Sequence, residues 1–254
     1  MKLFRKIRQQ LIGNRKFSDY VFYAIGEIIL VVIGILIALG INNGSQNRAN
    51  REKEQIYLQG LKNEFEISRV KLKELIHVNE ENIEGARKIT AYILDQKNVP
   101  DEKEFSKLLY QTFALDVAFN PNNSLLNEMV NSGSLKDVTN PELRIRLTNW
   151  FATLDDIAKQ EKDLAIQREK ILDIFRRNEF SIRTILEQSG VSNELNLSKG
   201  EKEVSNLDLL KSIEFENNVY MFILTSFATG NAHYRPLMED IQLILDLLEA
   251  SIDP

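Results

Sequence analysis

The sequence lacks cysteine, and it contains only 5 prolines and 11 glycines among 254 residues. The absence of cysteine excludes disulfide bonds, thiolate metal sites and a cysteine nucleophile. The prolines and glycines fall mostly between segments of helical periodicity, so we expect a mainly helical protein. No block of Lys and Arg occurs after the N-terminal segment, and the formal net charge is -5. A nucleic-acid partner is therefore not expected.

What the chain does contain is a long apolar run, Val21 to Ile41, with the sequence VFYAIGEIILVVIGILIALGI. A helix needs about 20 apolar residues to cross the hydrocarbon of a bilayer, so residues 21–41 are predicted to form one transmembrane helix. A cleaved signal peptide is the competing interpretation, because Ala38-Leu39-Gly40 resembles a cleavage site. The long basic leader and the charge of Glu27 favour an uncleaved anchor.

The segment before this run, residues 1–20, combines cations with apolar residues at helical spacing. We expect it to be an amphipathic helix at the cytoplasmic headgroup layer, as is typical of basic amphipathic segments. A comparable window after the span holds only three cations, Arg48, Arg51 and Lys53, against six before it, so the positive-inside rule places the N-terminus in the cytoplasm. The remainder, residues 42–254, is then expected in the periplasm, anchored to the inner membrane. The predicted headgroup contacts are Lys2, Arg5, Lys6, Arg8, Arg15 and Lys16.

Glu27 is the one charged residue in the span, and a carboxylate in hydrocarbon must face protein, water or an interface. It lies near the cytoplasmic headgroups in one interpretation, with Ile28–Ile41 as the true hydrocarbon run. In a second, it is protonated or hydrogen-bonded inside an oligomer. A proton or ion relay is the third. The candidate membrane or oligomer contacts are Gly26, Glu27, Gly34 and Ala38.

Two stretches of residues 42–254 carry apolar residues at alternating three- and four-residue spacing, which indicates helices packed along a seam. The second stretch starts with Asn140 as N-cap and Pro141 at the first helical position. It continues for about 45 residues, or roughly 70 Å at the helical rise. We expect an all-α fold: an elongated helical bundle or coiled-coil-like domain. The seams are formed by Leu58, Leu61, Phe65, Leu72, Leu75, Ala86, Ile89 and Ile93, and by Leu143, Leu147, Trp150, Leu154, Ile157, Leu164, Ile171, Phe175, Ile182 and Ile185.

The sequence also predicts helix caps and breaks between and after these stretches. Asp101 with Glu104 is typical of a helix start, and Gly133 is the expected C-terminal cap of a short helix. A helix is predicted over residues 207–229. A break is expected at Gly230-Asn231 and Arg235-Pro236, before the last helix.

The segment Tyr23–Asn43, YAIGEIILVVIGILIALGINN, together with Asn131–Lys136 and Asn140–Arg144, resembles the DUF6090 family. This resemblance implies a single-span protein of Bacteroidota with an inner-membrane location and a helical exterior. Family members often carry Trp after Ile-Asn-Asn, whereas Gly44 stands there in this chain. The resemblance transfers no catalytic residues.

No constellation of catalytic residues emerges from the sequence. Phosphate-binding loops, nucleophile elbows and zinc-protease motifs are missing. His77 with Glu80 or Glu81 shares a helical face, but a metal site needs more ligands. His233 is expected in a solvated turn. We therefore expect no enzyme, no cofactor and no metal.

The favoured hypothesis is a scaffold or oligomeric subunit of a membrane complex, with the lipid bilayer and a second copy or another membrane protein as partners. The alternative is a periplasmic ligand-sensing bundle that signals through a partner protein, with a pocket near Trp150 and Phe151.

Overall fold

The computed structural model describes residues 17–95, 97–177, 179–201 and 204–252. The basic segment, residues 1–16, lies outside them, as do the predicted headgroup contacts. Within the described ranges the fold is all-α, as predicted. The elements are α2 (Phe17–Leu94), α3 (Glu102–Phe113), α4 (Ser124–Ser132), η1 (Ser134–Asp137), α5 (Pro141–Phe175), α6 (Ile182–Ser189), α7 (Val191–Glu194), η2 (Leu207–Lys211), α8 (Ile213–Ala228), η3 (Thr229–Tyr234) and α9 (Arg235–Ser251).

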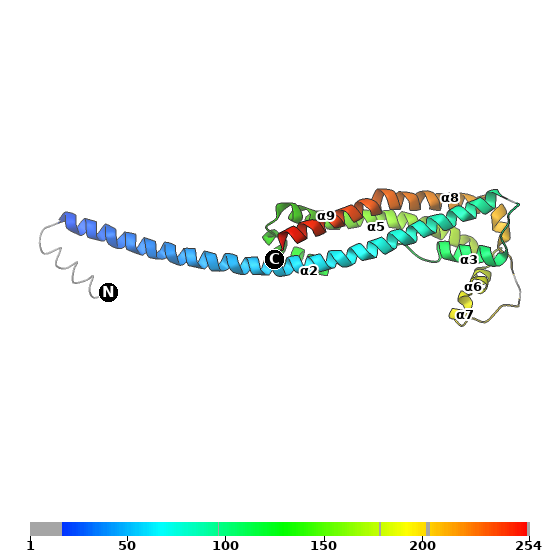
Figure 1. Cartoon of the computed structure of the whole chain (residues 1–254), viewed down its shortest axis with the longest axis horizontal. Helices are drawn as coiled ribbons and strands as arrows, with labels where there is room; N and C mark the ends of the chain where they lie inside the picture. The colour runs from blue at the N-terminus through cyan, green and yellow to red at the C-terminus, as the bar shows by residue number, and fades with distance from the viewer. Residues whose placement is uncertain (1–16, 96, 178, 202–203, 253–254) are drawn as a thin grey trace. The chain divides into compact units, whose positions relative to one another are not determined.

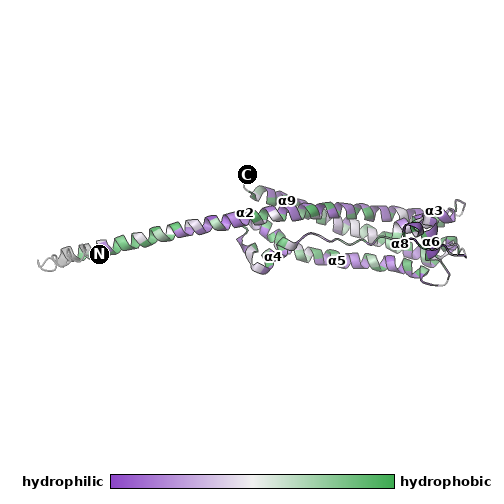
Figure 2. Cartoon of the chain, turned by 90° about the horizontal axis from the view of Figure 1, so that it is seen from below, coloured by the Kyte–Doolittle hydropathy of each residue, from purple (hydrophilic) through white to green (hydrophobic). Residues whose placement is uncertain are grey.

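The chain divides into two units, residues 1–56 and residues 57–254, and each is described by itself. The described part of the first unit is the N-terminal portion of α2. Its large apolar residues from Val21 to Ile41 are exposed, and Figure 2 colours this stretch of the helix mostly green, for hydrophobic residues, before polar residues follow. This portion is long and apolar enough to cross a membrane, and none of its apolar window is buried. These properties are compatible with a single-span membrane protein.

The second unit, called the body below, is a helical bundle. Three long helical segments run side by side in it: α2 from Tyr57 onward, α5, and the continuous segment α8–η3–α9 (Figure 1). Ion pairs between their surfaces show in which direction each segment runs. Lys62 pairs with Glu249 at 3.3 Å and Glu80 with Arg235 at 3.7 Å, so numbers rise along α2 as they fall along α9. The segment α8–η3–α9 is therefore antiparallel to α2.

The same reasoning places α5. Arg146 on α5 pairs with Asp240 at 3.4 Å, and Arg177, just after α5, pairs with Glu214 at 3.1 Å. Thus α8–η3–α9 is also antiparallel to α5, and α2 and α5 run in the same direction. Two parallel helices need a long connection between them, which residues 95–140 provide.

The core of the body lies between these segments and follows the predicted seams. Leu58, Leu61 and Leu72 are fully buried. The ring of Trp150 packs against that of Phe65, with centroids 4.9 Å apart, and contacts of this kind add to the burial of apolar area. The seam pattern of the sequence therefore identified the buried faces of α2 and α5 correctly.

Part of the connection between α2 and α5 is the strap, which we define as residues 114–123. It is not helical, so its backbone groups need partners from elsewhere. Side chains of α2 and α5 supply them: the Phe119 amide donates to Glu161 at 2.8 Å, and the Asn122 amide to Ser68 Oγ at 2.9 Å. Arg168 donates to the carbonyl of Ala114 at 3.0 Å. Ser68, Glu161 and Arg168 are thus polar because they bind a non-helical neighbour.

The predicted caps are confirmed. Asp101 accepts a hydrogen bond from the Glu104 amide at 2.7 Å, and Asn140 accepts from the amides of Glu142 and Leu143 at 3.1 Å. Gly133 ends α4 with φ of 72°, the left-handed conformation in which glycine avoids the cost of a Cβ.

Three features predicted from the sequence are wrong. The expected helix of about 45 residues ends at Phe175 after 35 residues, and α6 begins separately behind the N-cap Ser181. The expected break at Gly230 is absent, because η3 is a π-helical segment that joins α8 to α9. The helix predicted over 207–229 is divided at Ser212, which caps α8.

Candidate functional site

The middle of the body holds a buried carboxylate, Glu161 on α5, whose side chain is 8% exposed. Its Oε1 atom accepts two hydrogen bonds, from the Tyr234 hydroxyl at 2.7 Å and from the Phe119 amide at 2.8 Å. Tyr234 is fully buried at the end of η3. One carboxylate oxygen therefore links α5, the strap and the π-helical segment.

Burial shifts the ionisation of both partners. Desolvation raises the pKa of the Glu161 carboxyl, while the hydrogen bonds from Tyr234 and Phe119 oppose that rise, and the charge of Asp116 adds to it. The pKa of the Tyr234 phenol is raised, first by desolvation and then by the negative charge of Glu161. The phenol is therefore held as a hydrogen-bond donor to Glu161.

The π-helical segment η3 lies against α2 at Asn79. A π-helix pairs each amide with a carbonyl five residues back, as the Arg235 amide does with Gly230. Asn79 is 1% exposed, and its Nδ2 donates to the Ser226 carbonyl at 3.0 Å. A Cβ on Gly230 would lie 3.1 Å from that Nδ2, so glycine permits this close approach. Among the described residues, Oδ1 of Asn79 has no hydrogen-bond partner.

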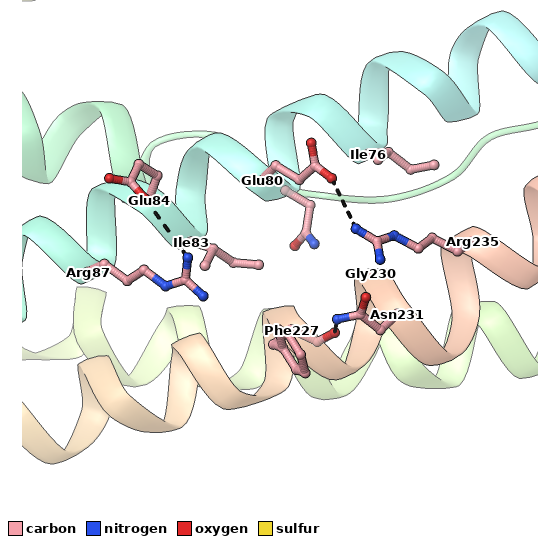
Figure 3. A pocket seen from close by; sticks show the side chains of 10 residues that line it. Ile76, Glu80, Ile83, Glu84, Arg87, Phe227, Gly230, Asn231 and Arg235 are labelled. Atoms are coloured by element: carbon pink, nitrogen blue, oxygen red, sulfur yellow. Dashed lines mark hydrogen bonds and ion pairs between the residues drawn. The ribbon is translucent and has the colours of Figure 1, made fainter.

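A pocket of about 520 Å³ opens beside this contact, and Asn79 is one of its lining residues. Figure 3 labels the other residues that line the pocket, which belong to α2 and to the segment α8–η3–α9. Two ion pairs lie on it: Glu80 with Arg235 at 3.7 Å and Glu84 with Arg87 at 4.0 Å. The apolar lining is Ile76, Ile83 and Phe227. The pocket thus combines both signs of charge with apolar surface, which suits a small molecule with a charged and an apolar end.

A second pocket, of about 560 Å³, lies between α2 and α3. Its walls include Glu81, Lys88 and Gln111. A Cβ on Gly85 would meet Thr112 Oγ1 at 2.2 Å, so α2 and α3 approach each other closely there. None of the buried side-chain atoms that lack a partner in the described chain belongs to its lining.

The surroundings of His77 agree with the sequence, whereas those of His233 differ from the expected turn. His77 is exposed and faces Glu81 at 3.6 Å, and no group of three or more metal-ligating side chains occurs in the described part of the chain. His233 is not in a solvated turn. It is part of η3, its side chain is 24% exposed, and its Nδ1 lies 3.7 Å from Asp156.

The sensing hypothesis expected a pocket near Trp150 and Phe151, and neither of the two body pockets described above is lined by these residues. Trp150 is buried against Phe65. Its indole Nε1 has no hydrogen-bond partner among the residues described. Its burial agrees with its predicted position on the seam of α5.

The candidate contacts of the span all lie on α2 in the first unit. Gly26, Gly34 and Ala38 are exposed, and Glu27 is half-exposed. A Cβ at Gly26 or Gly34 would meet nothing within 4 Å. Glu27, Gly34 and Ala38 share one helical face by their spacing, so this face is available to another helix.

Sequence reasoning missed the buried hydrogen bonds of Tyr234 and Ser226 and the close approach of Gly230 to Asn79. Uncharged polar residues do recur in this region, at Ser226, Thr229 and Asn231, within an otherwise apolar helix. That recurrence was the available signal. It was read as a break, because a glycine and a proline lie nearby.

The chain was compared with known proteins. No curated protein matches it, and no solved structure does. A family model described as a family of unknown function, DUF6090, matches residues 27–179, which is more than half of the chain. The match begins at Glu27 and includes Asn79 and Glu161, but not the π-helical segment. The chain therefore belongs to the DUF6090 family.

Proposed function

We propose that this protein is a non-enzymatic, membrane-anchored subunit that associates with a second copy of itself through the outer face of α8. In this proposal α2 crosses the inner membrane, the N-terminus is cytoplasmic and the body lies in the periplasm. The single observation that carries association is the composition of the exposed face of α8.

That face, called the α8 stripe, is unusually apolar for exposed surface. Its members follow one another at four- and three-residue spacing, as in helices that pack along a seam. They are Ile213, Asn217, Tyr220, Leu224 and Phe227, of which the four apolar ones are 72%, 44%, 62% and 52% exposed. No Asp, Glu, Lys or Arg occurs from Asn217 to Tyr234. A contiguous uncharged stripe of this kind is typical of an interaction surface.

A second copy is the occupant that fits this stripe best. Two-fold association buries the same patch on both partners, so an uncharged stripe meets an uncharged stripe. Asn217 then lies in the seam, where one polar residue can fix the register of two helices. Anchoring to a membrane raises the effective concentration of one copy near another. The face of Glu27, Gly34 and Ala38 offers a further site of contact between spans.

The absence of native cysteine allows a direct test in membranes. Leu224→Cys places one thiol on the α8 stripe, and Val70→Cys places one on α2 at a side chain of similar exposure, 65% against 62%. Mild oxidation should yield a disulfide-linked dimer of the Leu224→Cys protein and leave the Val70→Cys protein monomeric. Cysteines at Ile213 and Tyr220 extend the scan along the stripe. Equal cross-linking at Val70 and at all three stripe positions would contradict the proposal.

The Val70→Cys protein also tests orientation. A membrane-impermeant maleimide should label it in spheroplasts, because the proposal places the body outside the cytoplasm. If the thiol is labelled only after the membrane is dissolved, the body lies in the cytoplasm and the proposed topology is wrong.

Glu27 tests the contribution of the span to association. If its carboxyl is hydrogen-bonded within an oligomer, Glu27→Gln should preserve the mass of the detergent-solubilised protein and Glu27→Leu should reduce it, as measured by light scattering. Normal assembly of both variants would make Glu27 an interfacial residue and the span only an anchor.

A second candidate function is ligand sensing by the body. The pocket beside η3 favours it, since its size falls within the range of small-molecule sites. Binding there would act on the contact between α2 and the segment α8–η3–α9, which carries the α8 stripe.

A further inference from the structure

The pocket beside η3, lined by α2 and α8–η3–α9, has features of a built site that association does not require. It lies wholly within the body, and its volume of about 520 Å³ suits a ligand the size of an amino acid or somewhat larger. A π-helical segment forms one wall, and such segments recur at functional sites. The charge, the buried polar group and the apolar lining each constrain the ligand.

The charges of the pocket are only loosely paired with each other. The guanidinium of Arg235 lies 3.7 Å from Glu80, and that of Arg87 lies 4.0 Å from Glu84, near the limit for an ion pair. All four side chains are more than half exposed, so each pair contributes little to stability. A ligand can therefore replace a pair at low cost if it supplies both a carboxylate for an Arg and a cation for a Glu.

Asn79 supplies the second, independent observation. Its Nδ2 is fixed by the Ser226 carbonyl, which leaves Oδ1 as a buried acceptor without a donor in the described chain. A buried acceptor without a donor costs free energy. An ammonium group at the Glu80 side of the pocket has three N–H bonds and can donate to both Glu80 and Asn79. This acceptor therefore favours a cationic nitrogen on the ligand over an anion alone.

Ile76, Ile83 and Phe227 supply an apolar part of the wall, with no polar atoms in their side chains. An aliphatic or aromatic group of the ligand would be removed from water there. A polyvalent cation would gain nothing from this wall and would be repelled by Arg87 and Arg235. A bare anion would gain the two arginines but be repelled by Glu80 and Glu84.

We infer that this pocket binds a free α-amino acid with an apolar side chain, its carboxylate on Arg235, its ammonium on Glu80 and Asn79, and its side chain on the apolar wall. This ligand goes beyond association through the α8 stripe, with which its site shares only Phe227. It gives the sensing function, the second candidate above, a defined site.

Calorimetric titration of the full chain in mild detergent tests the ligand class. L-phenylalanine and L-leucine are the probes, with saturable binding expected at about millimolar dissociation constants or tighter. Two analogues of phenylalanine each lack one charge: phenylalaninamide lacks the carboxylate and 3-phenylpropionate lacks the ammonium. Each should bind at least about tenfold more weakly. No saturable binding of either amino acid, or equal affinity for either analogue, would overturn the inference.

Charge-removing variants test the position of the ligand. Arg235→Gln should weaken phenylalanine binding about tenfold or more, yet leave the affinity for phenylalaninamide unchanged, because the amide has no carboxylate to lose. Glu80→Gln should weaken the binding of both compounds. The matched control is Arg177→Gln, which removes an equally exposed guanidinium from the pair with Glu214. A loss in Arg235→Gln no larger than in this control overturns the site.

The variants also separate this inference from self-association. Arg235 and Glu80 lie outside the α8 stripe, so neither substitution should alter cross-linking of the Leu224→Cys protein. If the protein binds phenylalanine but the Leu224→Cys protein does not cross-link, the amino-acid site is supported and the dimer is contradicted. Cross-linking without binding would mean the reverse.

Discussion

Leu36 and Leu58 lie on the same helix, α2, yet the first is 61% exposed and the second is fully buried. Around Leu36 every neighbouring position is apolar and exposed, whereas around Leu58 apolar and polar positions alternate with the helical period. A helix that is apolar all round needs an apolar solvent, and an amphipathic one needs a protein core. One helix thus meets two environments, and the pattern of its residues distinguishes them.

The largest expected effect comes from alanine substitutions of these two leucines. Leu58→Ala should lower the free energy of unfolding of the body by about 2–5 kcal/mol, because it leaves a cavity in a core without water. Leu36→Ala should not change it. Chemical unfolding of both variants in detergent, followed by circular dichroism, measures the difference. A matching loss in the two variants would mean that Leu36 is part of a folded core.

A smaller effect is expected at the buried hydrogen bond between Tyr234 and Glu161. Tyr234→Phe removes one of the two donors to Glu161 and should cost about 1–3 kcal/mol of unfolding free energy. Because the pKa of Tyr234 is raised by folding, the native protein also retains this proton longer than the unfolded chain does. Stability from this group is complete below about pH 10 and falls as the pH rises further.

Alkaline unfolding curves test that sign. The wild type should lose stability above about pH 10 more steeply than Tyr234→Phe, which has no phenol to ionise. The other six of the seven tyrosines contribute to both curves, so the difference between the two isolates Tyr234. Parallel curves would show that Tyr234 ionises as readily in the folded protein as in the unfolded chain.

Glycines give a finer comparison between the two regions. Gly133 in the body has φ of 72°, so Gly133→Ala should cost about 1–2 kcal/mol for placing a Cβ in the left-handed region. Gly34 is helical and open, and Gly34→Ala should leave the unfolding of the body unchanged. Thermal unfolding of the two variants side by side measures this. A stabilised Gly133→Ala protein would place that residue outside the left-handed region.

The smallest expected effect is a change in pH dependence at Glu161. Folding raises its pKa, so the native state binds this proton more readily than the unfolded chain, whose glutamates have pKa values of about 4.3. Stability from Glu161 is therefore highest at acid pH and decreases as the pH rises through the interval above about 4.3. Glu161→Gln cannot titrate, so the stability of the wild type relative to this variant should decrease across that interval. A relative stability that instead rises with pH would mean that the hydrogen bonds outweigh burial.

Features with local causes were predictable from the sequence. The helix of the span follows from an uninterrupted apolar run, and the caps Asp101, Asn140 and Gly133 follow from side-chain or backbone chemistry within a few residues. The buried seams of α2 and α5 follow from periodicity. Helix lengths were less predictable, because the seam pattern continued to Ile185 while the helix ended at Phe175.

The candidate site was not predictable, because its parts are distant in the sequence. Asn79 and Ser226 are 147 residues apart, and Phe119 and Glu161 are 42 apart. By their spacing, Asn79 and Glu161 fall on the apolar seams of α2 and α5. The spacing could not show that one faces a π-helical segment and the other a non-helical strap.

The sequence by itself determined the helical class, the membrane-competent portion of α2 and the faces that are buried in the body, because each depends on neighbours within a few turns of helix. Tertiary structure decided the strap, the π-helical joint between α8 and α9, and the pocket with its unpaired Asn79 oxygen. These features exist because buried polar groups must find partners wherever the packed chain supplies them, and such partners have no fixed spacing in the sequence.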